Sequence, residues 1–251
     1  MSPTAAGSSI EGPKGAATKA TKDDIGFDVP LYTVAEAARF LGVPSTTFSK
    51  WAQGYTNTFP NRKAVIGQPI VTAVAAERHY PTVPFVGLTE GMVIAAFRDA
   101  GVSLQHIRKA VAVLEREIGM KHALASERLF TDGASILYDY AESDRDEDVL
   151  THVVTQQRVF AEVVKDYLRR ITYGRDGWPV RLVSPVTSRD VVAADPTRSF
   201  GQPIFIRGGI RVEDVLDRIR ADERPQAVAD DMGVSLDDIE AVLSAELRRA
   251  A

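Results

Sequence analysis

Residues 32–51, YTVAEAARFLGVPSTTFSKW, constrain the fold of this chain more than any other segment. Thr33 and Glu36 have the spacing of a capping box, in which two side chains satisfy backbone amides at the start of a helix. Gly42 suits the left-handed residue that ends a helix, and Pro44 suits the opening of the next one. Two short helices joined by a tight turn are the layout of a helix-turn-helix. The apolar face of the first helix consists of Val34, Ala37, Ala38 and Leu41.

The second of these helices begins with hydroxyl side chains and one cation, which are able to donate hydrogen bonds to phosphates or base edges. A turn-rich basic segment, residues 59–71, follows and suits a wing that lies on phosphates. Helical hairpins that bind no DNA have the same pattern, and each hydroxyl also suits a cap or a solvated surface. The candidate DNA-binding residues are Ser45, Thr46, Thr47, Ser49, Lys50, Arg62 and Lys63.

A second pair of helices is predicted after the wing. Thr89 is the expected cap of a helix over 90–100, and Ser103 is the expected cap of a helix over 104–118. The later helix carries one apolar stripe, which indicates either core packing or the seam of a homodimer, because winged DNA-binding proteins usually occupy two half-sites as symmetric dimers. The stripe consists of Leu104, Ile107, Val111, Leu114 and Ile118.

The rest of the chain divides by composition. We expect a disordered tail at residues 1–28, a winged domain at 29–141, an acidic linker and bridging helix at 142–183, and a trihelical domain at 184–251. Within these limits the pattern predicts a small hairpin at 129–140 and a long helix at 149–171, and this helix is the alternative to the 104–118 stripe as the seam of a homodimer. Gly208 and Gly209 mark a tight turn between two β-rich runs. The final three helices again have helix-turn-helix spacing, with Gly233 and Ser235 at their last turn.

Charge is segregated along the chain. Residues 31–130 hold 11 Lys and Arg against 7 Asp and Glu, whereas residues 201–251 hold 7 against 11. A polyanion is attracted to the first segment and repelled by the second, so two different partners are expected rather than one. The rear trihelical unit in particular begins its last helix with Asp237 and Asp238, which would face phosphates. Duplex DNA is therefore expected at the front of the chain only.

Several classes of function are disfavoured. The chain has no cysteine, and its four histidines lie far apart without the spacing of a metal site. We find no glycine-rich phosphate loop, no nucleophile elbow and no paired carboxylates near a histidine. No apolar run is long enough to span a membrane, and the first thirty residues lack the charged-then-apolar layout of a secretory signal. We therefore expect a cytoplasmic protein that is not an enzyme and holds no cofactor or metal.

Residues 32–51 together with 85–117, FVGLTEGMVIAAFRDAGVSLQHIRKAVAVLERE, resemble the MerR-type winged helix-turn-helix. Two positions depart from the usual pattern of that family. Pro44 stands where a serine cap is favoured, and Ser49 stands where an arginine usually contacts DNA. The resemblance implies a winged fold and binding to double-stranded DNA.

Residues 195–243, with GQPIFIRGGIRVEDVL at their centre, resemble the small helical domain of the uncharacterised family numbered 433 among domains of unknown function. The matching positions are Gly201, Pro203, Ile204, Gly208, Ile210 and Val212. The combined layout is similar to large VapB-type antitoxins, which implies neutralisation of a PIN-like ribonuclease toxin and autoregulation of an operon through operator DNA. Such nucleases cluster carboxylates around a metal, so an inhibitor that offers guanidinium groups is expected. The candidate toxin-binding residues are Arg198, Arg207 and Arg211, each of which also suits a surface salt bridge.

The predicted fold is mainly α with small β-hairpins (α+β), namely a MerR-like winged helix-turn-helix followed by a C-terminal trihelical, toxin-binding domain. Two alternatives stay open at this point. One is a MerR-like transcriptional regulator whose rear half responds to a small organic ligand. The other is an adaptor that uses both helical units for protein contacts.

Overall fold

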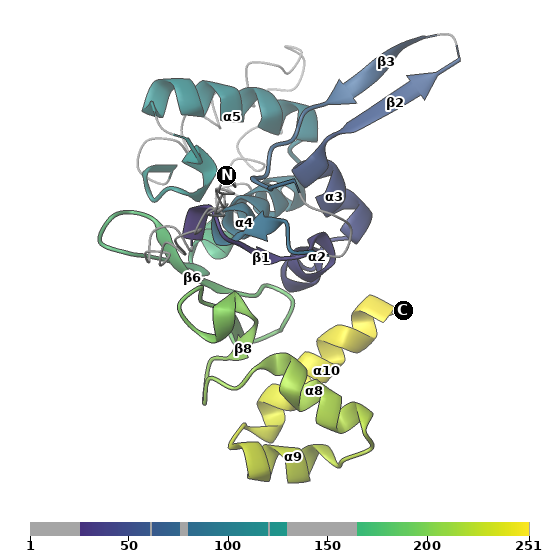
Figure 1. Ribbon diagram of the computed structural model, residues 1–251, viewed down its shortest axis with the longest axis vertical. Coiled ribbons are helices and arrows are strands. Elements are labelled where there is room, and N and C mark those ends of the chain that lie inside the picture. Colours follow the sequence, from purple (N-terminus) through teal and green to yellow (C-terminus); the bar gives the residue numbers. More distant parts are fainter. Residues whose placement is uncertain (1–25, 61, 76–79, 120, 130–164, 251) are drawn as a thin grey trace, which may run out of the picture.

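The computed structural model describes residues 26–60, 62–75, 80–119, 121–129 and 165–250 of the 251-residue chain. We call residues 26–129 the front lobe and residues 165–250 the rear lobe. Figure 1 shows the front lobe in purple to teal and the rear lobe in green to yellow, with the three last helices at the opposite end from the α5 helix. The predicted mixture of helices and small antiparallel sheets is confirmed. None of the helices in the described part combines the length and apolar character that crossing a membrane requires.

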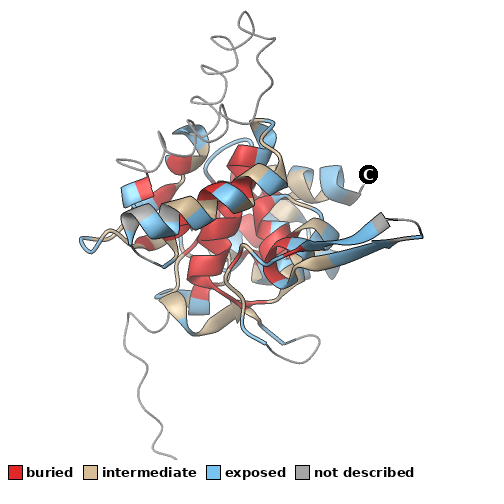
Figure 2. Ribbon diagram, turned by 90° about the horizontal axis from the view of Figure 1, so that it is seen from above, coloured by how far each residue is buried: buried red, intermediate tan, exposed pale blue. Residues whose placement is uncertain are grey.

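The front lobe is built around one buried helix. Its elements in chain order are β1 (Pro30–Tyr32), α2 (Val34–Leu41), α3 (Ser45–Gln53), β2 (Tyr55–Phe59), β3 (Arg62–Gly67), β4 (Val83–Pro84), α4 (Phe85–Asp99), α5 (Leu104–Ile118) and the 3-10 turn η1 (Ala123–Ala125). Every residue of α4 from Phe85 to Phe97 is buried. Figure 2 shows this burial at the centre of the molecule, with the β2–β3 hairpin projecting as an exposed wing.

The expected start of α4 at Thr89 is wrong. The helix begins one turn earlier at Phe85, after Pro84, and the Thr89 hydroxyl donates to the Phe85 carbonyl at 3.0 Å inside the helix. A helix that is buried on all sides has no polar face to mark its first turn, so Thr89 had the appearance of a cap. The expected cap at Ser103 is confirmed, because its hydroxyl accepts from the His106 amide.

The rear lobe combines a four-stranded sheet with three helices. Strands β5 (Ile171–Tyr173), β6 (Pro179–Val183), β7 (Val192–Ala194) and β8 (Ile204–Phe205) pair in chain order as an antiparallel meander. The 3-10 turn η3 (Ser199–Gly201) precedes β8, and helices α8 (Val212–Arg220), α9 (Pro225–Met232) and α10 (Leu236–Ala250) follow it. The predicted trihelical end of the chain is therefore present, with Gly233 in the left-handed conformation after α9.

Several predicted segments need correction or lie outside the described residues. The helix predicted over 149–171 lies outside the described residues up to residue 164. Its predicted end is wrong, because residues 165–168 are helical and Ile171 already begins β5. The four-stranded sheet crosses the expected boundary between residues 183 and 184. Residues 1–25 of the predicted tail, residues 130–140 of the hairpin predicted at 129–140 and the linker over 142–148 lie outside the described residues. Phe27, which the prediction assigned to the tail, packs edge-on against Trp178 with ring centroids 4.7 Å apart.

Candidate nucleic-acid interface

Both ends of helix α2 are capped by the residues that predicted the helix. At its N-terminus the Glu36 carboxylate accepts from the Thr33 amide at 2.7 Å, and the Thr33 hydroxyl accepts from the Glu36 amide at 3.2 Å. At its C-terminus Gly42 adopts φ +72, and the following Val43 amide donates to the Ala38 carbonyl at 3.0 Å. These bonds satisfy backbone groups that a short helix leaves unpaired, and they fix the direction in which α3 departs.

Helix α3 is anchored by aromatic side chains on its inner face. Phe48 is fully buried and Trp51 is 2% exposed, and their rings pack 5.9 Å apart. Pro44 opens the helix, and its carbonyl accepts from the Thr47 and Phe48 amides. The inner anchors leave the opposite face of α3 free to meet a ligand.

The outer face of α3 presents the hydroxyl and lysine side chains that the sequence singled out. Ser45, Thr46 and Lys50 are exposed, and Thr47 and Ser49 are half-buried. The Ser49 hydroxyl donates to the Gln53 side-chain oxygen at 2.9 Å. Gln53, which our sequence reasoning missed, therefore belongs to the same face, and its position four residues after Ser49 was the signal for it.

The wing lies next to α3. Strands β2 and β3 pair antiparallel from Tyr55 opposite Gly67 to Phe59 opposite Arg62, with a shift of register between Asn57 and Phe59. Lys63 is exposed on β3. Thus the structure brings Lys63 and the first residue of β3, Arg62, onto the hairpin that projects beside α3 (Figure 1). Neither acidic nor aromatic side chains follow Arg62 in this strand, which reads RKAVIG.

A cation outside the predicted set supports the base of the wing. The Arg108 guanidinium of α5 lies 5.2 Å from the centre of the Tyr55 ring, and its Nε donates to the Gln68 carbonyl at 2.8 Å. A cation over an aromatic face is attracted by the ring quadrupole. No local pattern in the sequence indicates this role for Arg108, because its two contacts are with residues 40 or more positions away.

Behind the wing, a buried carboxylate joins three segments of the front lobe. Glu90 is 4% exposed, and its Oε2 accepts from the Thr72 amide at 2.6 Å. Its Oε1 lies 3.0 Å from Nδ1 of His122 and 3.1 Å from the Thr72 hydroxyl. The hydrogen bond to Glu90 is the main cause of a raised pKa for His122, and burial opposes it. The cluster therefore ties the chain after β3 to α4 and η1. It borders a cavity of about 670 Å³.

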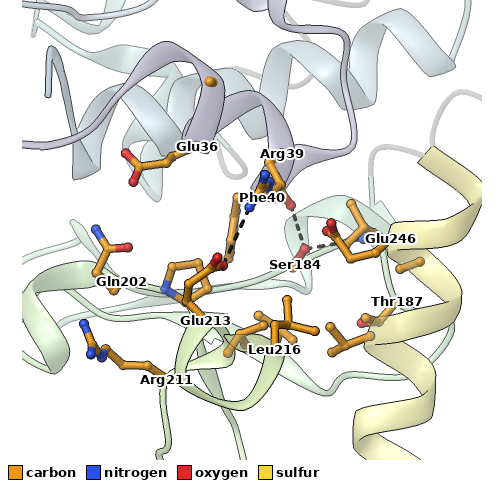
Figure 3. A pocket seen from close by; sticks show the side chains of 17 residues that line it. Glu36, Arg39, Phe40, Ser184, Thr187, Gln202, Arg211, Glu213, Leu216 and Glu246 are labelled. Carbon is orange, nitrogen blue, oxygen red and sulfur yellow. Dashed lines mark hydrogen bonds and ion pairs between the residues drawn. The ribbon is translucent and has the colours of Figure 1, made fainter. Parts of the chain in front are cut away.

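The two lobes meet along α2, where a cleft of about 410 Å³ opens between them. Figure 3 shows Arg39 and Phe40 of α2 facing Ser184, Glu213 and Leu216 of the rear lobe. The buried Ser184 hydroxyl donates to the Phe40 carbonyl at 2.6 Å. Arg39 and Glu213 form an ion pair at 3.7 Å across the cleft.

Two further contacts join the lobes. The Tyr32 hydroxyl donates to the Gly201 carbonyl at 2.8 Å, and Tyr32 is 1% exposed. Burial raises the pKa of that hydroxyl, with a smaller contribution from nearby Asp195, so it stays protonated as a donor. In addition, a Cβ added to Gly42 would lie 2.8 Å from Cγ1 of Val186. The turn of the helix-turn-helix is thus in close contact with the rear lobe.

The three arginines predicted to meet a partner differ in their surroundings. All are exposed, but Arg211 forms two hydrogen bonds to the Asp214 carboxylate, at 2.9 and 2.5 Å. Arg211 therefore makes a surface salt bridge, which was the expected alternative to contact with a toxin. Within the described part of the chain Arg198 and Arg207 make no ion pair, and Arg207 lies on the turn before Gly208, where φ is +83.

The helix-turn-helix at the end of the chain is acidic where α10 begins. Asp237 is exposed and pairs with Arg189 at 3.7 Å, and Asp238 is 6% exposed. Carboxylates in this place suit the positive end of the helix dipole. They would also repel a DNA backbone that approached α10 as it would approach α3. The preference for DNA at the front lobe rests on this contrast between the two units.

Comparison with known proteins gives matches for both lobes. Residues 30–111 match a family described as "Putative DNA-binding HTH domain", and residues 192–244 match one described as "Protein of unknown function (DUF433)". A protein of Mycobacterium tuberculosis described as "Putative antitoxin VapB45" is 42% identical over 234 residues, which are 88% of this chain and 96% of that protein. The X-ray crystal structure of Rv2018 from Mycobacterium tuberculosis is 37% identical, with a TM-score of 0.69 over 86% of this chain and 99% of that one.

Proposed function

Because the chain belongs to the same family as VapB45 of Mycobacterium tuberculosis, we propose that it is an antitoxin that binds DNA through its front lobe and a toxin through its rear lobe. One observation supports the DNA part above all. The outer face of α3, with its exposed hydroxyls and Lys50, lies beside a projecting wing within residues that match a DNA-binding family. The residues at the same place in the rear lobe are carboxylates.

The finer parts of the proposal are these. The toxin is a PIN-like ribonuclease, the DNA is the operator of the chain's own operon, and the protein acts there as a homodimeric repressor in the cytoplasm. The charge contrast between the lobes supports two different partners, and the absence of catalytic motifs in the sequence supports a regulatory role rather than an enzymatic one. The MerR-like character of the front lobe belongs to the same proposal.

Phosphate contacts by the front lobe have a measurable signature. Each lost phosphate contact weakens DNA binding and reduces the slope of log K against log salt by about 1. We expect this result for Lys50→Ala and for Lys63→Ala on a duplex that covers the promoter of the chain's own operon. Lys165→Ala, which removes an exposed lysine from the rear lobe, should leave the affinity and the slope unchanged. An equal loss in all three variants would contradict a front-lobe interface.

The toxin part is tested by co-expression with the protein encoded beside this gene. We expect the PIN-like neighbour to arrest growth alone, to be tolerated when this chain is present, and to co-purify with it. Failure of the full-length chain to capture or neutralise that neighbour would contradict the antitoxin proposal while leaving DNA binding intact.

A ligand-responsive regulator is the second candidate, and the cleft between the lobes favours it. Its walls come from α2 of the front lobe and from α8 and α10 of the rear lobe, so a small molecule held there would contact both. The same co-expression experiment separates the two candidates, because a small-molecule sensor would neutralise no neighbouring protein.

A further inference from the structure

One apolar side chain of the rear lobe, Phe200, is almost fully exposed to solvent. Phe200 is 86% exposed, the highest value among the large hydrophobic residues that the structure describes. Transfer of a phenylalanine side chain out of water is favourable, and aromatic residues contribute much of the binding energy of protein interfaces. Nothing in the described part of the rear lobe covers this ring. Its position therefore calls for an explanation.

The backbone that presents Phe200 is strained. Ser199 has φ +47, Phe200 has φ +53 and Gly201 has φ +77, so three consecutive residues lie in the left-handed region. Only two other non-glycine residues of the described chain, His122 and Asp222, have a positive φ. Side chains with a Cβ resist this conformation, and such strain persists only where the surrounding structure enforces it.

Several contacts enforce the loop from both sides. The Asp195 carboxylate accepts from the Thr197 amide at 2.8 Å and from its hydroxyl at 2.7 Å. The Tyr32 hydroxyl of the front lobe donates a hydrogen bond to the Gly201 carbonyl. A Cβ added to Gly201 would lie 2.7 Å from the Tyr32 hydroxyl oxygen. The folded chain thus maintains a loop with an unfavourable backbone conformation, and the apolar residue of that loop is exposed to water. Such an arrangement is expected where strain preorganises a binding surface.

The charges near Phe200 indicate the chemistry of the partner. Arg198 directly precedes Ser199 in the same loop. A Cβ added to Gly209 would lie 2.3 Å from Nη2 of Arg198, so the Arg198 guanidinium packs against the turn that carries Arg207. Neither arginine has an ion-pair partner among the described residues, unlike Arg211, which directly precedes α8. The nearest acidic group of the loop, Asp195, already accepts two hydrogen bonds from Thr197.

We propose that Phe200, together with Arg198 of its own loop and Arg207 of the turn that Arg198 contacts, is the anchor by which the rear lobe holds its protein partner. The partner surface that fits it has an apolar pocket for the ring and carboxylates beside that pocket for the two guanidiniums. This assignment rests on the proposed function, because it takes the toxin as that partner. A nucleic acid is the less suitable occupant, since the surrounding segment 201–251 holds 11 acidic against 7 basic residues.

The test uses full-length chain and the PIN-like protein encoded beside it, with dissociation constants measured for the purified pair. Phe200→Ala should weaken the complex about 30-fold or more, mainly through faster dissociation. Arg198→Ala and Arg207→Ala should each weaken it by about tenfold, with a loss that shrinks at high salt. The matched control is Leu247→Ala on α10, which removes another exposed apolar side chain, 72% exposed, and should change the affinity less than threefold.

Phe200→Gly separates binding from folding. Glycine accepts a positive φ at no steric cost, so this variant should melt roughly 2–4 °C higher than the wild type while it binds the partner as poorly as Phe200→Ala. A purely structural role for Phe200 predicts the opposite change in melting temperature. DNA retardation by both variants should match the wild type.

The outcomes are distinguishable. If Phe200→Ala binds the partner as tightly as Leu247→Ala does, the anchor assignment is overturned and the antitoxin proposal survives. If the wild-type chain captures no such neighbour, the antitoxin proposal fails and the anchor assignment fails with it. If Phe200→Ala instead loses affinity for duplex DNA, the patch is a nucleic-acid contact and the assignment is overturned.

Discussion

Gly42 allows the contact between the lobes to be measured as a free energy. In Gly42→Ala the new Cβ meets two separate obstacles, the φ of +72 at that residue and the Cγ1 atom of Val186 at 2.8 Å. The left-handed conformation costs about 1 kcal/mol for a residue with a Cβ. Displacing a β-branched side chain from its rotamer costs about 1 kcal/mol more. We therefore expect Gly42→Ala to lower the free energy of unfolding by about 2 kcal/mol.

A matched glycine isolates the first of these costs. Gly233 ends α9 with φ +66, and a Cβ there would meet nothing within 4 Å. Gly233→Ala should therefore cost only the backbone share, about 1 kcal/mol. Val186→Ala removes the obstructing methyl, so in that background Gly42→Ala should also cost about 1 kcal/mol. The double-mutant cycle then gives a coupling of about 1 kcal/mol between Gly42 and Val186.

Urea unfolding of the four cycle members, at one pH and one protein concentration, measures these differences. A coupling smaller than about 0.5 kcal/mol is ordinary additivity and would refute the close packing of the turn against the rear lobe. Equal costs for Gly42→Ala and Gly233→Ala would lead to the same conclusion.

Two more predictions concern buried polar contacts. His122 has a raised pKa in the folded chain because it donates to Glu90, so its contribution to stability is fully present below about pH 6.5 and is lost as the pH rises through the raised pKa. The free energy of unfolding of the wild type relative to His122→Asn, measured in urea across this range, should therefore fall with increasing pH, and a flat difference would exclude the contact. Tyr32→Phe leaves the Gly201 carbonyl without its donor and should cost about 1–3 kcal/mol, whereas Tyr80→Phe, at a 63% exposed tyrosine, should cost less than about 0.5 kcal/mol. Equal costs in chemical denaturation would contradict the buried bond.

The sequence predicted those elements whose signals are local. The capping box of Thr33 and Glu36, the left-handed Gly42 and the turn at Gly208 each depend on residues a few positions apart, and each is present. These features fix φ, or satisfy a backbone amide, whatever the rest of the chain does.

Features that depend on distant partners were not predictable in this way. Strand β5 at Ile171 pairs with Leu182 across a turn, although its sequence continues a helical pattern. Arg211 pairs with Asp214 while Arg207 does not, and spacing alone permits both arrangements. The strained presentation of Phe200 depends on Tyr32, which precedes it by 168 positions, and no local pattern announces it.

The bond between Tyr32 and Gly201 has a practical consequence for anyone who dissects this chain. Cutting between the lobes would strand a buried phenol on one fragment and an unsatisfied carbonyl on the other, and would also leave the Phe40 carbonyl without Ser184. Each orphaned group costs free energy that the intact chain does not lose. Fragments produced separately would therefore report the weakness of their newly exposed surfaces, so truncations are poor surrogates and point substitutions in the whole molecule are the sound route to assigning each surface.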